Sequence, residues 1–244
     1  MNAIFLLYAR EIKSRFTSPM IYILAAIFSG MLGYLFFSLF LEANRLQNIS
    51  IESAVIRPLF GNINALLIFI IPLLSMKSFS EEKRQATINL LFLSPLSDRQ
   101  IVTAKILSGV VVMVFFLTLT FIFPLILFMS GYQNTASILS GYIGVFLHGI
   151  CCLVFSQFCS SLTKNTALAG ILGIFGLLFF MSFSWTAQTS QNFLVSQIFD
   201  YLSLGSHYEP FSRGTIRSYD LVYYMSFFSF FWFLLMASLD SRNW

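Results

Sequence analysis

Two histidines are the residues of this sequence whose chemistry best suits a reaction or a ligand. His148 lies in the middle of a long apolar block, where an ionisable side chain suggests a proton or substrate contact. A histidine satisfied by contacts between helices is the alternative that we favour. His207 and Glu209 are two residues apart, and without a third ligand nearby they make a weak metal site. We therefore expect no bound metal.

Other arrangements that support catalysis are missing from the sequence. Cys151, Cys152 and Cys159 fall in one apolar block without the paired spacing of metal ligands, and we interpret them as small buried hydrophobic residues. Neither a Ser, His and Asp set nor a carboxylate pair indicates an enzyme. The phosphate-binding pattern G-x-x-x-x-G-K-[ST] does not occur, so we expect no ATP or other cofactor on this chain. The modest net charge of +4 does not indicate nucleic-acid binding.

One charged stretch, Ser80 to Lys105, interrupts the apolar blocks. It begins with acids, which favour a helix N-terminus, and continues into leucines, so we predict an amphipathic helix over residues 81–93 across the membrane face. A solvated run of charges is the alternative. Pro95 ends this helix, and Ser97 with Gln100 has the form of a capping box that starts the next one. The residues of this stretch that we single out are Glu81, Glu82, Lys83, Arg84, Thr87, Leu90 and Leu91.

Membrane helices must position these residues. A composition of 57% hydrophobic and 10% charged residues, with a mean hydropathy of +0.81, excludes an ordinary water-soluble fold. In lipid, helices or closed barrels satisfy the backbone, and the apolar blocks lack strand-like alternation. We predict an all-α integral membrane protein, a single domain over residues 1–244. Its six spanning helices are expected at residues 20–41, 62–79, 101–130, 137–162, 166–185 and 221–239.

Two further segments are expected at the membrane surface. Residues 2–17 place apolar side chains opposite Arg10 and Lys13, which predicts an amphipathic helix in the headgroup layer. Residues 186–219 form an insertion before the sixth span, with enough apolar residues for one short interfacial helix. Arg213 and Gly214 predict a turn that leads into that span.

Individual residues inside the spans also predict local structure. Pro72 predicts a kink. Lys105, one turn inside the third span, is expected to extend to the headgroups rather than to form a buried ion pair. A glycine series at helical spacing in the fifth span favours close helix packing over a ligand role. Its members are Gly170, Gly173 and Gly176.

The basic residues give the orientation. Of the 14 Lys and Arg residues, ten fall on one side of the predicted spans and four on the other. Lys and Arg are more frequent in the cytoplasmic loops of membrane proteins than in the loops on the other side. We therefore expect both termini and the Ser80 to Lys105 stretch to be cytoplasmic. The four on the opposite side are Arg45, Arg57, Arg213 and Arg217.

The stretch EEKRQATINLLFLSPLSDRQIVTAKIL resembles the corresponding segment of ABC-2 type permeases, the membrane subunits of ABC exporters. The likeness extends over the whole chain, through the six spans, the interfacial N-terminal helix and the external insertion. This chain has Ala86 where many members have glycine. The C-terminal part, Ser206 to Trp244, is similar to gliding-motility permeases of the GldF type.

The resemblance implies a type V exporter-like fold in which residues 81–93 are the coupling helix. That helix would dock on a separate ATPase subunit, which binds ATP and Mg²⁺. The permease itself is expected in the inner membrane of a bacterium. It also implies a second permease subunit, identical or related, and a dimer seam that includes the face of Gly170, Gly173 and Gly176. Membrane lipids surround the complex. One alternative is a subunit without transport activity that passes force to a periplasmic partner; another is an intramembrane enzyme or ion carrier centred on His148.

Overall fold

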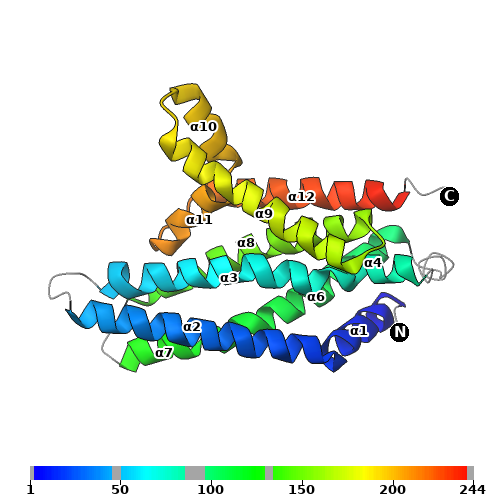
Figure 1. Ribbon diagram of the computed structural model, residues 1–244, viewed down its shortest axis with the longest axis horizontal. Helices are drawn as coiled ribbons and strands as arrows, with labels where there is room; N and C mark the ends of the chain where they lie inside the picture. Colours follow the sequence, from blue (N-terminus) through cyan, green and yellow to red (C-terminus); the bar gives the residue numbers. More distant parts are fainter. Residues whose placement is uncertain (1–2, 46–50, 86–96, 130–133, 241–244) are drawn as a thin grey trace.

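The computed structural model describes residues 3–45, 51–85, 97–129 and 134–240, and in these ranges the chain is helical without strands (Figure 1). Most of the helices run side by side in one elongated bundle. In order they are α1 (Ala3–Thr17), α2 (Pro19–Arg45), the π-helical turn η1 (Glu52–Ile56), α3 (Arg57–Ser75), α4 (Lys77–Arg84), α6 (Asp98–Thr120), α7 (Ile122–Met129), α8 (Thr135–Leu162), α9 (Thr166–Thr189), α10 (Phe193–Leu202), α11 (Leu204–Ser212) and α12 (Ser218–Asp240).

Six helical segments are long and apolar enough to cross a membrane, which confirms the predicted all-α class and number of spans. The second segment, however, starts earlier than predicted. Residues 52–61 were expected in a connecting loop, but η1 and α3 extend the helix outward to Glu52. The segments are Pro19–Ala43, Glu52–Arg84, Asp98–Met129, Thr135–Leu162, Thr166–Thr189 and Ser218–Asp240.

Helix α8 forms the centre of the bundle and contacts α3, α4, α6, α9, α11 and α12. Its glycines explain how α3, α6 and α11 can approach it closely. A Cβ atom on Gly141 would lie 2.5 Å from the Phe60 ring of α3, and one on Gly144 would overlap Phe211 of α11. The space beside Gly149 is occupied in the same way by Met113 of α6. Large side chains, two aromatic rings and a methionine, thus occupy the space beside these glycines.

Two prolines coincide with breaks in the spanning helices. Pro124 cannot donate to the carbonyl of Thr120, and the helix is interrupted there between α6 and α7. Thr120 turns its hydroxyl to the Leu117 carbonyl at 2.7 Å and to the Tyr142 hydroxyl at 3.0 Å. Pro72 lies inside α3, and one turn later Met76 separates α3 from α4, with its amide bonded to the Pro72 carbonyl at 2.8 Å.

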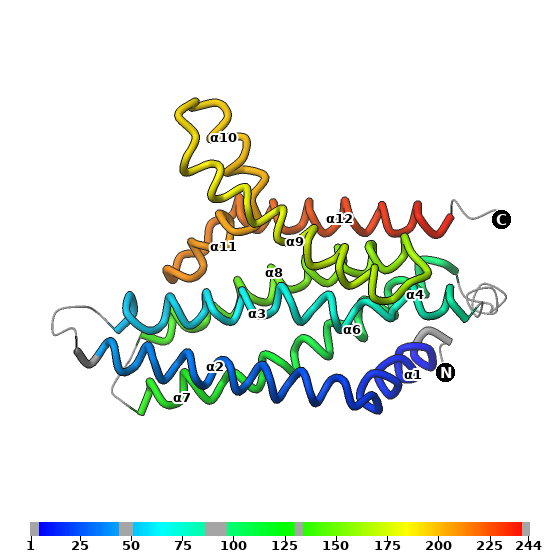
Figure 2. Tube along the Cα trace, in the orientation of Figure 1, coloured from blue at the N-terminus to red at the C-terminus, as the bar shows by residue number. Residues whose placement is uncertain are grey.

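The insertion before the sixth span differs from the prediction of one short helix. Helix α9 continues to Thr189, and two helices follow, α10 and α11. Figure 2 shows α10 projecting from the side of the bundle, and none of its residues is buried. Helix α11 instead packs into the bundle. It ends in the predicted turn at Gly214, whose φ of +79° suits glycine.

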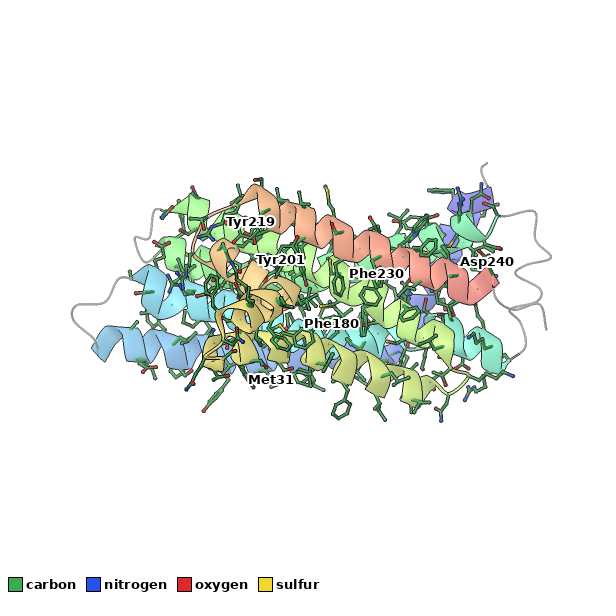
Figure 3. All side chains as sticks on the ribbon, turned by 90° about the horizontal axis from the view of Figure 1, so that it is seen from above. Met31, Phe180, Tyr201, Tyr219, Phe230 and Asp240 are labelled. Carbon is green, nitrogen blue, oxygen red and sulfur yellow. The ribbon has the colours of Figure 1, made fainter. Side chains whose placement is uncertain are left out.

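The two ends of the bundle are distinct. The N-terminus, the C-terminus and α4 lie at one end, here called the terminal end, as six spans require (Figure 1). Figure 3 shows the same polarity along α12, with Tyr219 near one end of the helix and Asp240 at the other.

Candidate functional site

Lys105 is the centre of a buried ion cluster at the terminal end. Its side chain is 2% exposed, and its ammonium lies 2.8 Å from Glu82 of α4 and 3.3 Å from Glu11 of α1. It also donates to the Ser78 carbonyl at 2.8 Å, and the Phe79 ring centroid is 5.1 Å away. The expectation that Lys105 reaches the headgroups is therefore wrong. Two carboxylates and a carbonyl compensate the ammonium in place of water, which allows it to remain buried.

This ion cluster joins three helices that are far apart in the sequence. Glu11, Glu82 and Lys105 come from α1, α4 and α6, and each contact spans at least 23 residues of chain. Separating buried charges is costly, because each charge is then left without its partner. If α4 moves, α6 and α1 must therefore move with it, or the contacts of Lys105 with the two glutamates must break. The cluster is thus a rigid connection between the charged stretch and the third span.

Helix α4 is also anchored to the central helix α8. The Ser160 hydroxyl accepts the amide hydrogens of Phe79 and Ser80, each at 3.1 Å, and donates to the Met76 carbonyl at 2.8 Å. The Lys83 ammonium donates to the Ser161 carbonyl. These bonds satisfy the backbone where α3 gives way to α4. Gln157 extends the link by donating to the Lys105 carbonyl at 3.1 Å.

The outer face of α4 is polar and open. Glu81 accepts hydrogen bonds from Arg84 at 2.5 Å and from Gln85 at 2.7 Å. Of the predicted coupling residues, Glu82 and Lys83 thus point to α6 and α8, whereas Glu81 and Arg84 stay on the surface. The predicted helix start at Glu81 lies inside α4, which begins at Lys77. Thr87, Leu90 and Leu91 lie outside the described residues.

The glycine series of α9 faces helices of the same chain. A Cβ atom on Gly173 would lie 2.9 Å from the Pro72 ring of α3, and one on Gly170 would lie 3.2 Å from the sulfur of Met76. Gly176 is covered by the Phe155 ring of α8. The glycines allow α9 to pack closely inside the chain, so their face does not lie open for a second subunit.

His148 is fully buried in α8, between the rings of Tyr208 and Tyr224 at centroid distances of 5.9 and 6.3 Å. Within the described residues, neither ring nitrogen has a hydrogen-bond partner. His148 thus packs between helices, as the sequence analysis favoured, but its contacts are with aromatic rings and do not satisfy its ring nitrogens. Tyr208 donates its hydroxyl to the Phe60 carbonyl at 2.8 Å instead.

His207 belongs to a buried pair that the sequence analysis missed. Its Nδ1 lies 2.7 Å from Asp220 Oδ1, and its Nε2 lies 3.1 Å from the Tyr201 carbonyl. A carbonyl only accepts, so Nε2 carries hydrogen, and the proton between Nδ1 and Oδ1 belongs to the pair. Glu209, the other half of the weak metal pair, instead bonds Arg213. The sequence signal for this pair was Asp220, a carboxylate at the start of a spanning helix, where a buried charge needs a partner.

The described ranges contain no cluster of three or more potential metal ligands. The cysteines are free and buried: Cys151, Cys152 and Cys159. What the geometry offers is mechanical, namely a charged helix end connected through buried ion pairs to spanning helices.

Fold and site together define a polytopic α-helical membrane domain with a buried ion cluster at one end. Residues 2–215 match the family described as ABC-2 type transporter, and the chain belongs to that family. Among curated proteins, no match was found.

Proposed function

We propose that this chain is the permease subunit of an ATP-driven exporter whose separate ATPase subunit docks on α4. The membership in the ABC-2 type transporter family supports a membrane subunit, and the sequence contains no phosphate loop of its own. The concentration of Lys and Arg at the terminal end supports a cytoplasmic location for that end and for both termini. The family resemblance implies that the bilayer is the inner membrane of a bacterium.

The observation that carries the proposal is the pairing of Lys105 with both Glu82 and Glu11. A docking helix must transmit displacement to the spans, and α4 has a buried connection to α6, α1 and α8. Its exposed side offers Glu81 and Arg84 to a partner. Closure of the ATPases would push α4, and the ion cluster would carry the motion into the third span.

We propose further that the working unit contains two permease chains, identical or related. Helices α2 and α9 have long apolar faces that nothing in the described chain covers, and a seam between two chains would use these faces. Gly170, Gly173 and Gly176 support such a seam only indirectly, because they hold α9 against α3 and α8.

The docking step is tested with a charge exchange on the surface of α4. The double variant Glu81→Arg, Arg84→Glu keeps an ion pair within the helix but reverses the charges that a partner meets. We expect an ATPase subunit to copurify with the wild type from native membranes and to be lost or uncoupled in the variant. Lys164→Gln, at an exposed position of the same end, is the control. An ATPase that binds and works normally with the charge-exchanged chain contradicts docking through α4.

A second candidate function is force transmission to a periplasmic partner, as the likeness to gliding-motility permeases implies. The observation that favours it is α10, a helix without any buried residue and with exposed Phe193, Leu194 and Ile198. Deletion of α10 separates the two functions. Loss of partner binding with no transported cargo in the reconstituted wild type would favour force transmission, whereas cargo transport without α10 would exclude it.

A further inference from the structure

A cavity of about 560 Å³ opens at the terminal end among α1, α4 and α6. Its volume lies within the range of small-molecule sites. The lining changes in character along the helices. From α3 to α4 it passes from Leu73 and Leu74 to Lys77 and Glu81, and on α6 from Val112 to Lys105. The cavity therefore has an apolar part toward the middle of the bundle and a charged part toward the terminal end.

The charged part carries an excess of positive charge. Lys105 is compensated by Glu11 and Glu82, and the third lining carboxylate, Glu81, pairs with Arg84. Four lining cations face three lining carboxylates, which leaves a net charge of +1. The cations are Arg10, Arg15, Lys77 and Lys105, of which Arg10 lies 3.7 Å from Glu11.

Arg15 is a buried cation of the cavity whose hydrogen bonds are long. Its two terminal nitrogens reach the Leu74 carbonyl at 3.4 Å and the Ser78 hydroxyl at 3.5 Å, both long for hydrogen bonds. Its Nε is buried and, in the described part of the chain, has no partner. Burial lowers the pKa of the Arg15 guanidinium, while Glu11 raises it, but an arginine stays protonated. A buried donor without an acceptor is unfavourable, so an anionic group bound at this guanidinium would relieve that cost.

We propose that this cavity binds the phosphate of an anionic phospholipid through Arg15 and Lys77. The planar fork of a guanidinium matches two phosphate oxygens, and the ammonium at the exposed mouth adds a third contact. The acyl chain follows the apolar part, past Ile21 and Leu74. This apolar part favours a lipid over free phosphate, as does the position of the cavity beside α1, the helix expected in the headgroup layer. The site does not depend on the proposed ATPase docking.

The test measures lipid binding to the purified full-length chain in a neutral detergent. Phosphatidylglycerol, phosphatidylcholine and inorganic phosphate are added separately, and bound molecules are counted by native mass spectrometry. We expect phosphatidylglycerol to bind at least tenfold more tightly than either other probe. Hydrogen bonds to charged groups contribute more to the binding free energy than bonds between neutral groups. Arg15→Gln and Lys77→Gln should therefore each weaken binding on the order of tenfold or more.

Lys13→Gln is the matched control, because Lys13 lies on α1, is exposed and does not line the cavity. It removes the same charge and should leave binding within about twofold of wild type. If Arg15→Gln does not fold, Lys77→Gln, at an exposed position, decides. Equal losses in Lys13→Gln and Lys77→Gln would reduce the effect to surface attraction and overturn the proposal. Inorganic phosphate that binds as tightly as phosphatidylglycerol would overturn the lipid assignment.

Discussion

Removal of the Lys105 ammonium is the perturbation that tests the ion cluster most directly. In Lys105→Met, a side chain of similar length fills the same space, but Glu11 and Glu82 lose their shared cation. Loss of one partner of a buried ion pair typically costs about 3–5 kcal/mol, because the remaining charge is buried without compensation. The two glutamates are 12% and 17% exposed, so water relieves part of this and we expect the lower end of the range.

The assay is thermal unfolding of the purified chain in detergent, followed by intrinsic fluorescence. For a domain of this size, about 1 kcal/mol corresponds to roughly 2–4 °C in Tm, so Lys105→Met should lower Tm by about 6–12 °C. The compensated triple variant Glu11→Gln, Glu82→Gln, Lys105→Met leaves no unpaired charge. It should recover most of the loss, because neutral replacement of a buried ion cluster is often close to neutral in stability.

Two results would refute this reasoning. If Lys105→Met unfolds at the wild-type temperature, the cluster does not connect the three helices energetically. If the triple variant is no more stable than the single variant, the loss comes from packing of the lysine stem rather than from the unpaired carboxylates. Either way the proposed path from α4 to α6 would lose its physical basis.

Three further predictions concern the packing of α8, the His207 pair and the Tyr208 bond. Gly144→Ala should lower Tm, since overpacking costs about 1–3 kcal/mol, while Gly30→Ala, with open space around it, should not; thermal unfolding of the two variants compares them. Asp220→Ala should cost about 1–3 kcal/mol because it removes the acceptor of His207, and the Tm should be restored in part by the double variant with His207→Phe. Tyr208→Phe, which removes the side-chain hydrogen bond to the Phe60 carbonyl, should cost about 0.5–1.5 kcal/mol in the same assay, and an unchanged Tm would contradict that bond.

The number of spans and the helical class could be predicted from the sequence because the requirement is local. A backbone in lipid must satisfy its hydrogen bonds within each segment, and about 20 apolar residues suffice to cross the bilayer. The start of α6 was equally local: the amide of Ser97 bonds the Gln100 side chain at 3.1 Å, as the capping motif predicts. The family resemblance had the same source, a continuous charged and leucine-rich stretch.

Boundaries and partners could not be predicted in this way. The outward extension of the second span to Glu52 depends on contacts of η1 with α2 and α8, which lie elsewhere in the chain. The two helices of the insertion were predicted as one, because the polar residues of α11 hide the packing of Leu204 and Phe211 into the core. Local composition therefore underestimated what tertiary contacts can bury.

The sequence by itself determined that the chain is a six-span helical membrane protein with a charged segment at one end. Only the tertiary structure decided what the charges do. Lys105 is paired because folding brings Glu11, from 94 residues away, and Glu82 to the same buried point. His148 and His207 differ for the same reason: one meets only aromatic rings, whereas the other meets Asp220. The fate of an ionisable group in a low-dielectric interior depends on which groups surround it in space, and no local pattern contains that information.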